Sequence, residues 1–221
     1  MTDLVIDAVI EDDATHVLAG LPGLGGTATL VEGLGELRRL GATGLGAAFP
    51  AEGDPVGLGG PREFNAEALE AGEAVVVEGL GLGLVPQRTG AVVVWTACPA
   101  QRRQLPDVGE ADRALRAALI ATADALADLE VARWRPEVAD QLLDLQHREA
   151  LVAPDGVPPR CVELASRGLQ AAGIVALALE DDGGAVTALE ATLRRAALVP
   201  LDRAGRAALT AACSPEVWPP G

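Results

Sequence analysis

The sequence predicts an α+β fold, with a small mixed β-sheet and covering helices in the N-terminal half, followed by an α-helical region packed on it. Of the 26 glycines, 18 lie at or before Gly90, among short β-branched runs. After about residue 105, leucine and alanine recur at helical spacing. The charge also changes, because the first hundred residues carry 14 acids and 4 arginines and the remainder carries 18 and 13. We therefore divide the chain into a glycine-rich α/β region, 1–104, and an α-helical region, 105–221, which can form one compact domain.

The first elements follow from apolar runs and their stop signals. A β-branched run predicts a strand at Leu4–Ile10. Leucines at helical spacing predict a helix from about Thr27 to Leu40, and Gly41 is the residue expected to end it. Asn65 is expected to cap a short helix at Ala66–Ala71. Further strands are expected at Gly44–Phe49, Ala74–Glu78 and Ala91–Ala97, with a loop at 51–61 and a glycine-rich segment at 79–90.

The second region is predicted to be helical throughout. Leucines on one stripe indicate a helix from Glu110 to about Trp134, and Pro136 can begin another. A proline-rich loop precedes a helix at about Arg160–Leu179 that is apolar on nearly all sides. Two shorter helices are expected near 186–193 and 202–213, and the extended tail can place Trp218 in a groove.

Few side chains in this chain are suited to catalysis. All seventeen basic residues are arginine, and the chain has neither lysine nor tyrosine. Histidine occurs only at His16 and His147. Schiff-base lysines, P-loop lysines and catalytic tyrosines are therefore excluded. Asp12 or Asp13 with His16 would give a cation too few ligands, so we expect no metal site and no cofactor.

Charge and composition also restrict the partners. A net charge of −15 repels phosphate backbones, and three Trp and two Phe provide few stacking surfaces, so we expect no nucleic-acid binding. The N-terminus is acidic where a signal peptide is basic, and the apolar runs are shorter than a membrane span. Three widely separated cysteines fit reduced thiols. These patterns predict a cytoplasmic protein that does not bind membranes.

Glycine loops and arginines suggest one candidate ligand site. Gly25 and Gly26 precede the predicted helix at 27–40, where exposed backbone N–H groups can bind an anion. Four arginines follow or flank similar loops and could bind a carboxylate or phosphate through bidentate hydrogen bonds: Arg62, Arg88, Arg102 and Arg103. Alternatively, the glycines allow tight packing and the arginines pair with nearby acids.

A tryptophan between two arginines is the most distinctive cluster of the helical half. Arg133, Trp134 and Arg135 combine residue types that recur at binding hot spots. The same cluster can instead cover the joint between two helices.

Three strings resemble a group of uncharacterised proteins from high-GC bacteria: GLGLVPQRTGAVVVW, PAQRRQLPDVGEADRALRAAL and LADLEVARWRPEVAD. The resemblance covers most of the chain. It implies that the three strings belong to one architecture, and it transfers no activity and no catalytic residue.

Two classes of function remain. The first is a non-catalytic interaction or regulatory protein that self-associates, as a dimer, through the apolar helix at 160–179. The second is a binding protein or non-covalent enzyme for a small acidic ligand, held by arginines and backbone amides. A concave site lined by Arg62, Arg88 and Arg102 or Arg103 would favour the second class.

Overall fold

The computed structural model describes residues 14–101, 103–128, 151, 153, 156–180 and 188–219. Four sequence predictions lie outside the described residues: the strand at Leu4–Ile10, the helix beginning at Pro136, the ligand-site residue Arg102, and the partner-binding cluster of Arg133, Trp134 and Arg135. In chain order the elements are β1 (Thr15–Ala19), β2 (Thr27–Thr29), α2 (Leu30–Leu40), β3 (Gly44–Ala48), α3 (Arg62–Ala71), β4 (Ala74–Glu78), β5 (Leu82–Thr89), β6 (Val92–Pro99), α4 (Val108–Asp128), α6 (Pro159–Glu180), α7 (Ala188–Ala212) and the 3-10 turn η1 (Pro215–Val217).

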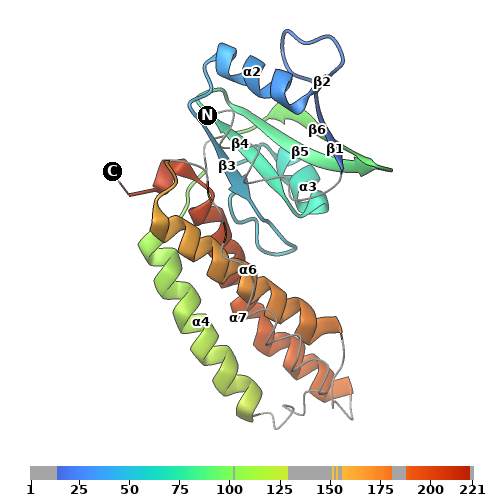
Figure 1. The fold of residues 1–221 in the computed structure, drawn as a ribbon. Coiled ribbons are helices and arrows are strands. Elements are labelled where there is room, and N and C mark those ends of the chain that lie inside the picture. The colour runs from blue at the N-terminus through green and yellow to red at the C-terminus, as the bar shows by residue number, and fades with distance from the viewer. Residues whose placement is uncertain are drawn as a thin grey trace.

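The strands form a mixed sheet of order β2-β1-β6-β5-β4-β3. Only β1 and β6 are parallel among these strands, and every other neighbouring pair is antiparallel. The helices α4, α6 and α7 follow the sheet in the chain and extend away from it (Figure 1). The predicted α+β class, with a mixed sheet followed by helices, is confirmed.

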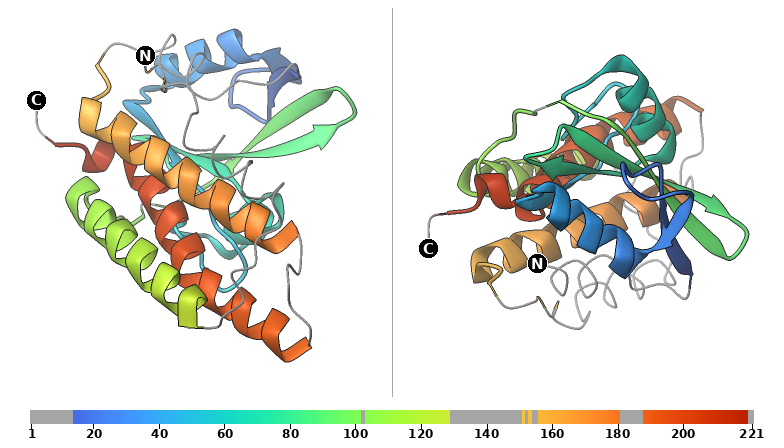
Figure 2. Two further views of the ribbon diagram at one scale, coloured as in Figure 1. Left: turned by 60° about the horizontal axis from the view of Figure 1, so that its bottom comes forward. Right: turned by 90° about the horizontal axis from the view of Figure 1, so that it is seen from above.

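Helices α2 and α3 cover opposite faces of the sheet (Figure 2). On the α2 face, Leu18 and Trp95 pack with Leu34 and Leu37 of the helix. On the α3 face, Phe64 and Ala68 pack on the strand residues Val76 and Val85, together with Ala48, Ala74 and Ala100. Apolar side chains that alternate between the two faces therefore bury both sides of the central strands.

Local signals account for the ends of α2. Thr29 Oγ1 accepts a hydrogen bond from the Glu32 backbone N–H, and the Glu32 carboxylate accepts one from the Thr29 backbone N–H, forming a capping box. At the other end Gly41 has φ = 105°, a left-handed conformation that glycine adopts without the steric cost of a Cβ. The predicted end of this helix at Gly41 is thus confirmed.

The helical half has its own core of small and branched side chains. Helix α7 packs against both α4 and α6. Helices α6 and α7 approach each other closely at Gly168, where an added Cβ would lie 2.8 Å from Leu209 Cγ and 3.2 Å from the Gly205 carbonyl oxygen. Fully buried Leu115, Leu164, Leu198 and Leu201 fill the centre of this core. The C-terminal end of α7 contacts β3, so the helical core is connected to one edge of the sheet.

Several predicted boundaries are wrong. The glycine-rich segment 79–90 contains the strand β5, because Gly83 leaves room for the Phe64 ring against the sheet. Helix α3 begins at Arg62 with Pro61 as its N-cap, and Asn65 lies inside the helix, where its Oδ1 accepts a hydrogen bond from the Gly60 N–H at 2.9 Å. The cap at Asn65 and the start at Ala66 are therefore corrected.

The two short helices predicted near 186–193 and 202–213 are one continuous helix, α7. Pro200 lies inside it and is exposed, whereas Leu198 and Leu201 on either side are fully buried. Burial of these leucines against the neighbouring helices offsets the backbone hydrogen bond that proline cannot donate.

Candidate functional site

Arg103 lies in a structural cluster rather than in an open site. Its side chain is almost fully buried, and its Nε donates to Glu216 Oε1 at 2.9 Å. Nη1 donates to the carbonyls of Ala47 at 2.6 Å and Gly57 at 3.2 Å, and Nη2 donates to Ser214 Oγ at 2.8 Å. The guanidinium thereby joins the segment after β6 to β3, to the 51–61 loop and to the residues after α7.

The other described arginines of the predicted site lie elsewhere. Arg62 is exposed at the first residue of α3, and Arg88 is exposed near the end of β5. Of the three, only Arg88 lines the pocket described below. The described arginines therefore do not converge on one site.

Gly25 and Gly26 lie in the loop before β2, which separates them from α2. The first turn of α2 is capped by the side chain of Thr29. The predicted anion site required the backbone N–H groups of both glycines to lie at the start of that helix. Neither glycine lies there.

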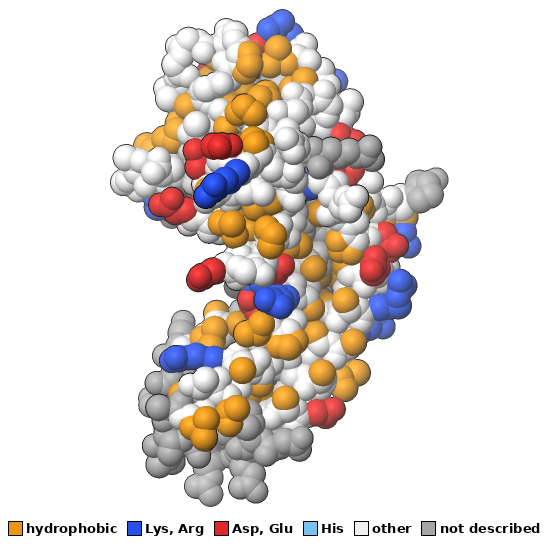
Figure 3. All heavy atoms as spheres, turned by 180° about the vertical axis from the view of Figure 1, so that it is seen from behind, with side chains coloured by type: hydrophobic (Ala, Val, Ile, Leu, Met, Phe, Trp, Pro, Cys, Tyr) orange, Lys and Arg blue, Asp and Glu red, His pale blue; other side chains and the backbone are white. Residues whose placement is uncertain are grey.

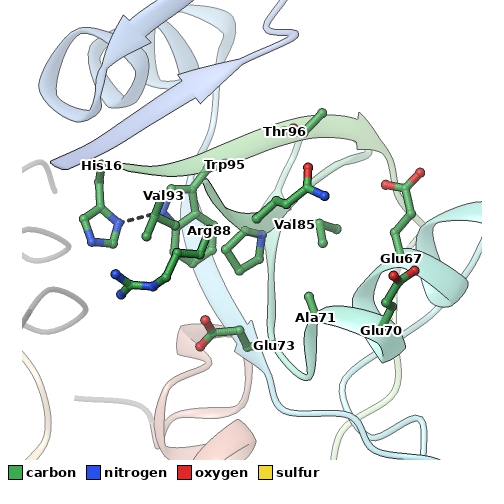
Figure 4. A pocket seen from close by; sticks show the side chains of 12 residues that line it. His16, Glu67, Glu70, Ala71, Glu73, Val85, Arg88, Val93, Trp95 and Thr96 are labelled. Carbon is green, nitrogen blue, oxygen red and sulfur yellow. Dashed lines mark hydrogen bonds between the residues drawn. The ribbon is translucent and has the colours of Figure 1, made fainter. Parts of the chain in front are cut away.

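A pocket of about 790 Å³ lies at the outer part of β5 (Figure 4). Four consecutive strand residues, 85–88, form one wall. The C-terminal turns of α3 and the start of the following segment form another, through Glu67, Glu70, Ala71 and Glu73. The remaining lining residues come from β1 and β6: His16, Val93, Trp95 and Thr96.

Unequal pairing of β5 creates this pocket. Along one edge β5 pairs with β6 over its whole length, from Leu82 to Thr89. Along the other edge its register with β4 ends at Leu84. Within the described parts of the chain, no strand pairs with residues 85–89 on that side. Pro86 fits such a position, because a proline has no N–H to donate and is tolerated where a strand lies at an edge.

The strand register places the lining side chains on two sides of this edge. Pro86 and Arg88 pair with Trp95 and Val93, so these four side chains share the α2 face of the sheet. Val85 and Gln87 lie on the opposite, α3 face by the same alternation, and Figure 4 shows Val85 on the side of Glu67 and Glu70.

Trp95 and His16 form a polar contact in this pocket. The Trp95 Nε1–H donates to His16 Nδ1 at 2.9 Å, and the two rings stack with centroids 6.3 Å apart. A neutral imidazole that carries its hydrogen on Nε2 fits this bond. The parallel pairing of β1 with β6 brings the two residues together, although 79 positions separate them in the chain.

The ionisable groups give the pocket an acidic character. Among the described residues, three glutamates line it, at positions 67, 70 and 73, together with one arginine, Arg88, and one histidine, His16. Low-dielectric walls lined mainly by one sign of charge raise the local concentration of ligands of opposite charge. The pocket therefore suits a cationic ligand better than an acidic one.

The cysteines are poorly suited to nucleophilic chemistry. Burial raises the pKa of the Cys98 thiol, and the Glu67 carboxylate adds to the increase. Burial also raises the pKa of Cys161, and it raises the pKa of Cys213 to about 11, with a contribution from neighbouring Cys161. The reactive form is the thiolate, which these shifts disfavour near neutral pH. Within the described residues, no group of three or more His, Cys, Asp or Glu is placed to hold a metal ion.

Reasoning from the sequence identified Arg88 but missed the rest of the pocket. Glu67 and Glu70 were a usable signal, because a spacing of three aligns two side chains along one face of the predicted helix, whereas Glu73 lies beyond the end of α3. The contribution of His16 and Trp95 depends on the sheet topology and has no local signal.

The fold and the pocket together define a class: an α+β protein whose mixed sheet carries an acidic groove at an open strand edge and whose helices pack as a separate core. Two family models match the chain. One, described as Rv1486c-like protein, N-terminal domain, matches residues 1–111, and the other, Rv1486c-like protein, C-terminal domain, matches residues 109–210. The chain therefore belongs to the Rv1486c-like family.

The family takes its name from a mycobacterial protein of uncharacterised function, which agrees with the resemblance to a group from high-GC bacteria. Searches of curated proteins and of solved structures each found no significant match.

Proposed function

We propose that this protein is a non-catalytic interaction or regulatory protein of the cytoplasm that self-associates, as a dimer, through its helical half. The observation that carries the proposal is an exposed apolar stripe on α7. Leu189 is 67% exposed and Leu193 is 43% exposed, although both are large apolar side chains. Residues three and four apart lie on one face of a helix, so Ala196, Val199 and Pro200 continue the same exposed stripe.

Helix α6 adds to this surface. Leu169 and Leu179 are exposed on it, whereas Leu164, Ala171 and Val175 are buried in the helical core. Of the described helices, α6 alone is long and apolar enough to cross a membrane by length and composition, and core helices of soluble proteins meet the same criterion. Helix α6 packs along α7 in the helical core. A second copy of this chain would add its own helices to that core.

The back of the molecule shows apolar side chains along the helical part, with charged side chains between and beside them (Figure 3). Apolar surface of this kind on a soluble protein marks interaction sites. Stable dimers bury about 800 Å² on each partner, which two helical faces of this length can supply.

The alternative function, binding of a small acidic ligand by arginines, has weaker support. Arg103 is fully engaged with Glu216, Ser214 and backbone carbonyls, and Arg62 does not line the pocket. Arg88 does line it, but three glutamates share the same pocket and repel an anion.

Size-exclusion chromatography with light scattering tests the proposal. We expect the wild-type protein to elute as a dimer and the double variant Leu189→Glu/Leu193→Glu as a monomer. Val31→Glu is the matched control, because Val31 is 56% exposed on α2, in the sheet half. Circular dichroism would verify that each variant is folded. A double variant that is folded and still dimeric would contradict this interface.

A further inference from the structure

We propose that Cys161 and Cys213 are a redox-sensitive pair, which forms a disulfide when the protein meets a peroxide and thereby joins the start of α6 to the end of α7. Both thiols are free in this structure. The inference rests on where the packing of α6 against α7 places these two positions. It is independent of self-association, because the bond lies within one chain.

The glycine contacts between α6 and α7 set the register of the two helices. An added Cβ at Gly168 would meet Leu209, and an added Cβ at Gly205 would lie 3.4 Å from Ala171 Cβ. Positions that rise along α6 therefore face positions that fall along α7, so the helices are antiparallel. The start of α6 accordingly lies beside the last part of α7 (Figures 1 and 2).

This register brings the two cysteines to the same level. Gly168 and Gly205 mark facing positions, because an added Cβ at Gly168 would lie 3.2 Å from the Gly205 carbonyl oxygen. Cys161 lies seven residues before Gly168, about 10.5 Å along α6. Cys213 lies eight residues after Gly205, about 12 Å along the line of α7. The two levels therefore differ by about 1.5 Å, the rise of one residue.

Both cysteines also lie on the facing sides of the two helices. Cys161 is 1% exposed and belongs to the helical core with Leu164, three residues farther along α6. The Cys213 N–H donates to the Leu209 carbonyl at 2.9 Å, which extends the last turn of α7 by one residue. Because Leu209 faces Gly168 on α6, the side chain four residues later faces the same helix.

The backbones at these positions can come close enough for a disulfide. The bond requires Cα atoms roughly 4.4–6.8 Å apart. Glycine and alanine let α6 and α7 approach closely, at Gly168, Ala171 and Gly205. Cys161 lies in the first turn of α6, and Cys213 directly follows the last residue of α7. A small shift at the two helix ends therefore suffices to align the sulfurs.

Hydrogen peroxide supplies the oxidising equivalents. One cysteine sulfur attacks a peroxide oxygen, the O–O bond breaks, and a sulfenic acid forms with release of one water. The second sulfur then attacks the sulfenic sulfur, the hydroxyl group leaves as a second water, and the S–S bond forms. The two thiol protons leave in the two waters. The two sulfurs together lose two electrons, which the peroxide gains.

The environment of the thiols sets the speed of this reaction. Burial raises the pKa of Cys161. Burial also raises the pKa of Cys213 to about 11, and the nearby Cys161 thiol adds to the increase. Because the thiolate is the attacking form, the pair reacts slowly near neutral pH. The rate of disulfide formation should therefore rise between pH 7 and pH 9.

The disulfide would stabilise the junction between the sheet and the helices. The Cys213 carbonyl accepts a hydrogen bond from the Ala47 N–H of β3 at 3.0 Å, and the next residue, Ser214, accepts one from Arg103. The bond would close a loop of about 50 residues, which lowers the entropy of the unfolded chain. The oxidised protein should therefore melt several degrees higher than the reduced protein.

Peptide mapping of the full-length protein tests the pairing. The protein is treated with hydrogen peroxide, denatured, alkylated with N-ethylmaleimide and digested with trypsin, which places the three cysteines on separate peptides because arginines lie between them. We expect the peptides containing Cys161 and Cys213 to be joined, with Cys98 unlinked. Cys98 is the internal control, since it lies on β6 in the sheet half. Absence of the joined pair, oxidation to sulfinic acid in its place, or a bond to Cys98 would overturn the proposal.

Two variants test the effect on stability. In Cys98→Ala, peroxide is expected to raise the melting temperature as in the wild type, and dithiothreitol should reverse the change. In Cys213→Ala, peroxide should give no such increase. Non-reducing electrophoresis should show the oxidised wild type at the mass of one chain. A wild-type melting temperature that does not rise, an equal rise in Cys213→Ala, or a covalent dimer would contradict an intrachain bond between α6 and α7.

Discussion

Arg103 and Glu216 are joined across 113 positions of the chain by an Nε–Oε1 distance of 2.9 Å. Arg103 follows the last strand of the sheet, and Glu216 follows the last long helix. Since the Arg103 side chain is only 1% exposed and that of Glu216 is 24% exposed, water screens this pair poorly at the arginine. The pair connects the sheet half to the helical half at the β3 edge.

Arg103→Met is expected to lower the free energy of unfolding by about 3 kcal/mol, because it leaves buried carbonyls and a partly buried carboxylate without their donor. Urea denaturation monitored by circular dichroism measures this change. Arg39→Met is the control, since the Arg39 side chain is 66% exposed and its i,i+3 pair with Glu36 on α2 should contribute at most about 1 kcal/mol. Similar losses for the two variants would contradict a structural role for the Arg103 cluster.

Gly46 is predicted to be essential for the same cluster. An added Cβ at Gly46 would collide with Arg103 Nη2, whereas at Gly25 it would meet nothing within 4 Å. Gly46→Ala should therefore lower the melting temperature by several degrees, corresponding to about 1–3 kcal/mol of overpacking. Gly25→Ala should leave the melting temperature almost unchanged. Differential scanning calorimetry measures both melting temperatures. A melting temperature of Gly46→Ala equal to that of the wild type would disprove this packing.

The stability of the protein should fall at alkaline pH because of its cysteines. The chain has no lysine and no tyrosine, so thiols are the only side chains that titrate between about pH 8 and pH 12. Burial raises the pKa of Cys213 from its ordinary value of 9.0 to about 11, so the folded state holds this proton more tightly than the unfolded state. The stabilisation is therefore complete below pH 9 and is lost as the pH rises through 11, by at most about 3 kcal/mol.

Urea denaturation at a series of pH values from 8 to 11.5 measures this loss. Cys213→Ala should show a much flatter dependence than the wild type. A wild-type free energy of unfolding that stays constant over this range would be inconsistent with a raised pKa of the Cys213 thiol in the folded state.

The sequence predicted elements with strong local signals and missed those set by tertiary contacts. Helix α2 was predicted because Leu34 and Leu37 lie at helical spacing and Gly41 ends it. Strand β5 was missed because glycines and Pro86 disfavour a strand locally, although Phe64 packs against Gly83 and the open edge accommodates Pro86.

The same distinction applies to the candidate site. Arg88 could be selected as an arginine beside a glycine turn, but only the parallel β1–β6 pairing brings His16 to Trp95. The role of Arg103 was equally hidden, since its partners at Ala47 and Glu216 lie 56 and 113 positions away. A single sequence carries no direct record of such contacts.

Sedimentation equilibrium over a wide range of protein concentrations tests self-association most directly. The apolar stripe on α7, from Leu189 to Pro200, predicts that the wild-type protein approaches twice its chain mass of 22.5 kDa as concentration rises. It also predicts that the variant Leu189→Glu/Leu193→Glu remains at the chain mass throughout. A wild-type protein that stays at the chain mass at every concentration would contradict the proposal that the helical half is a dimer interface.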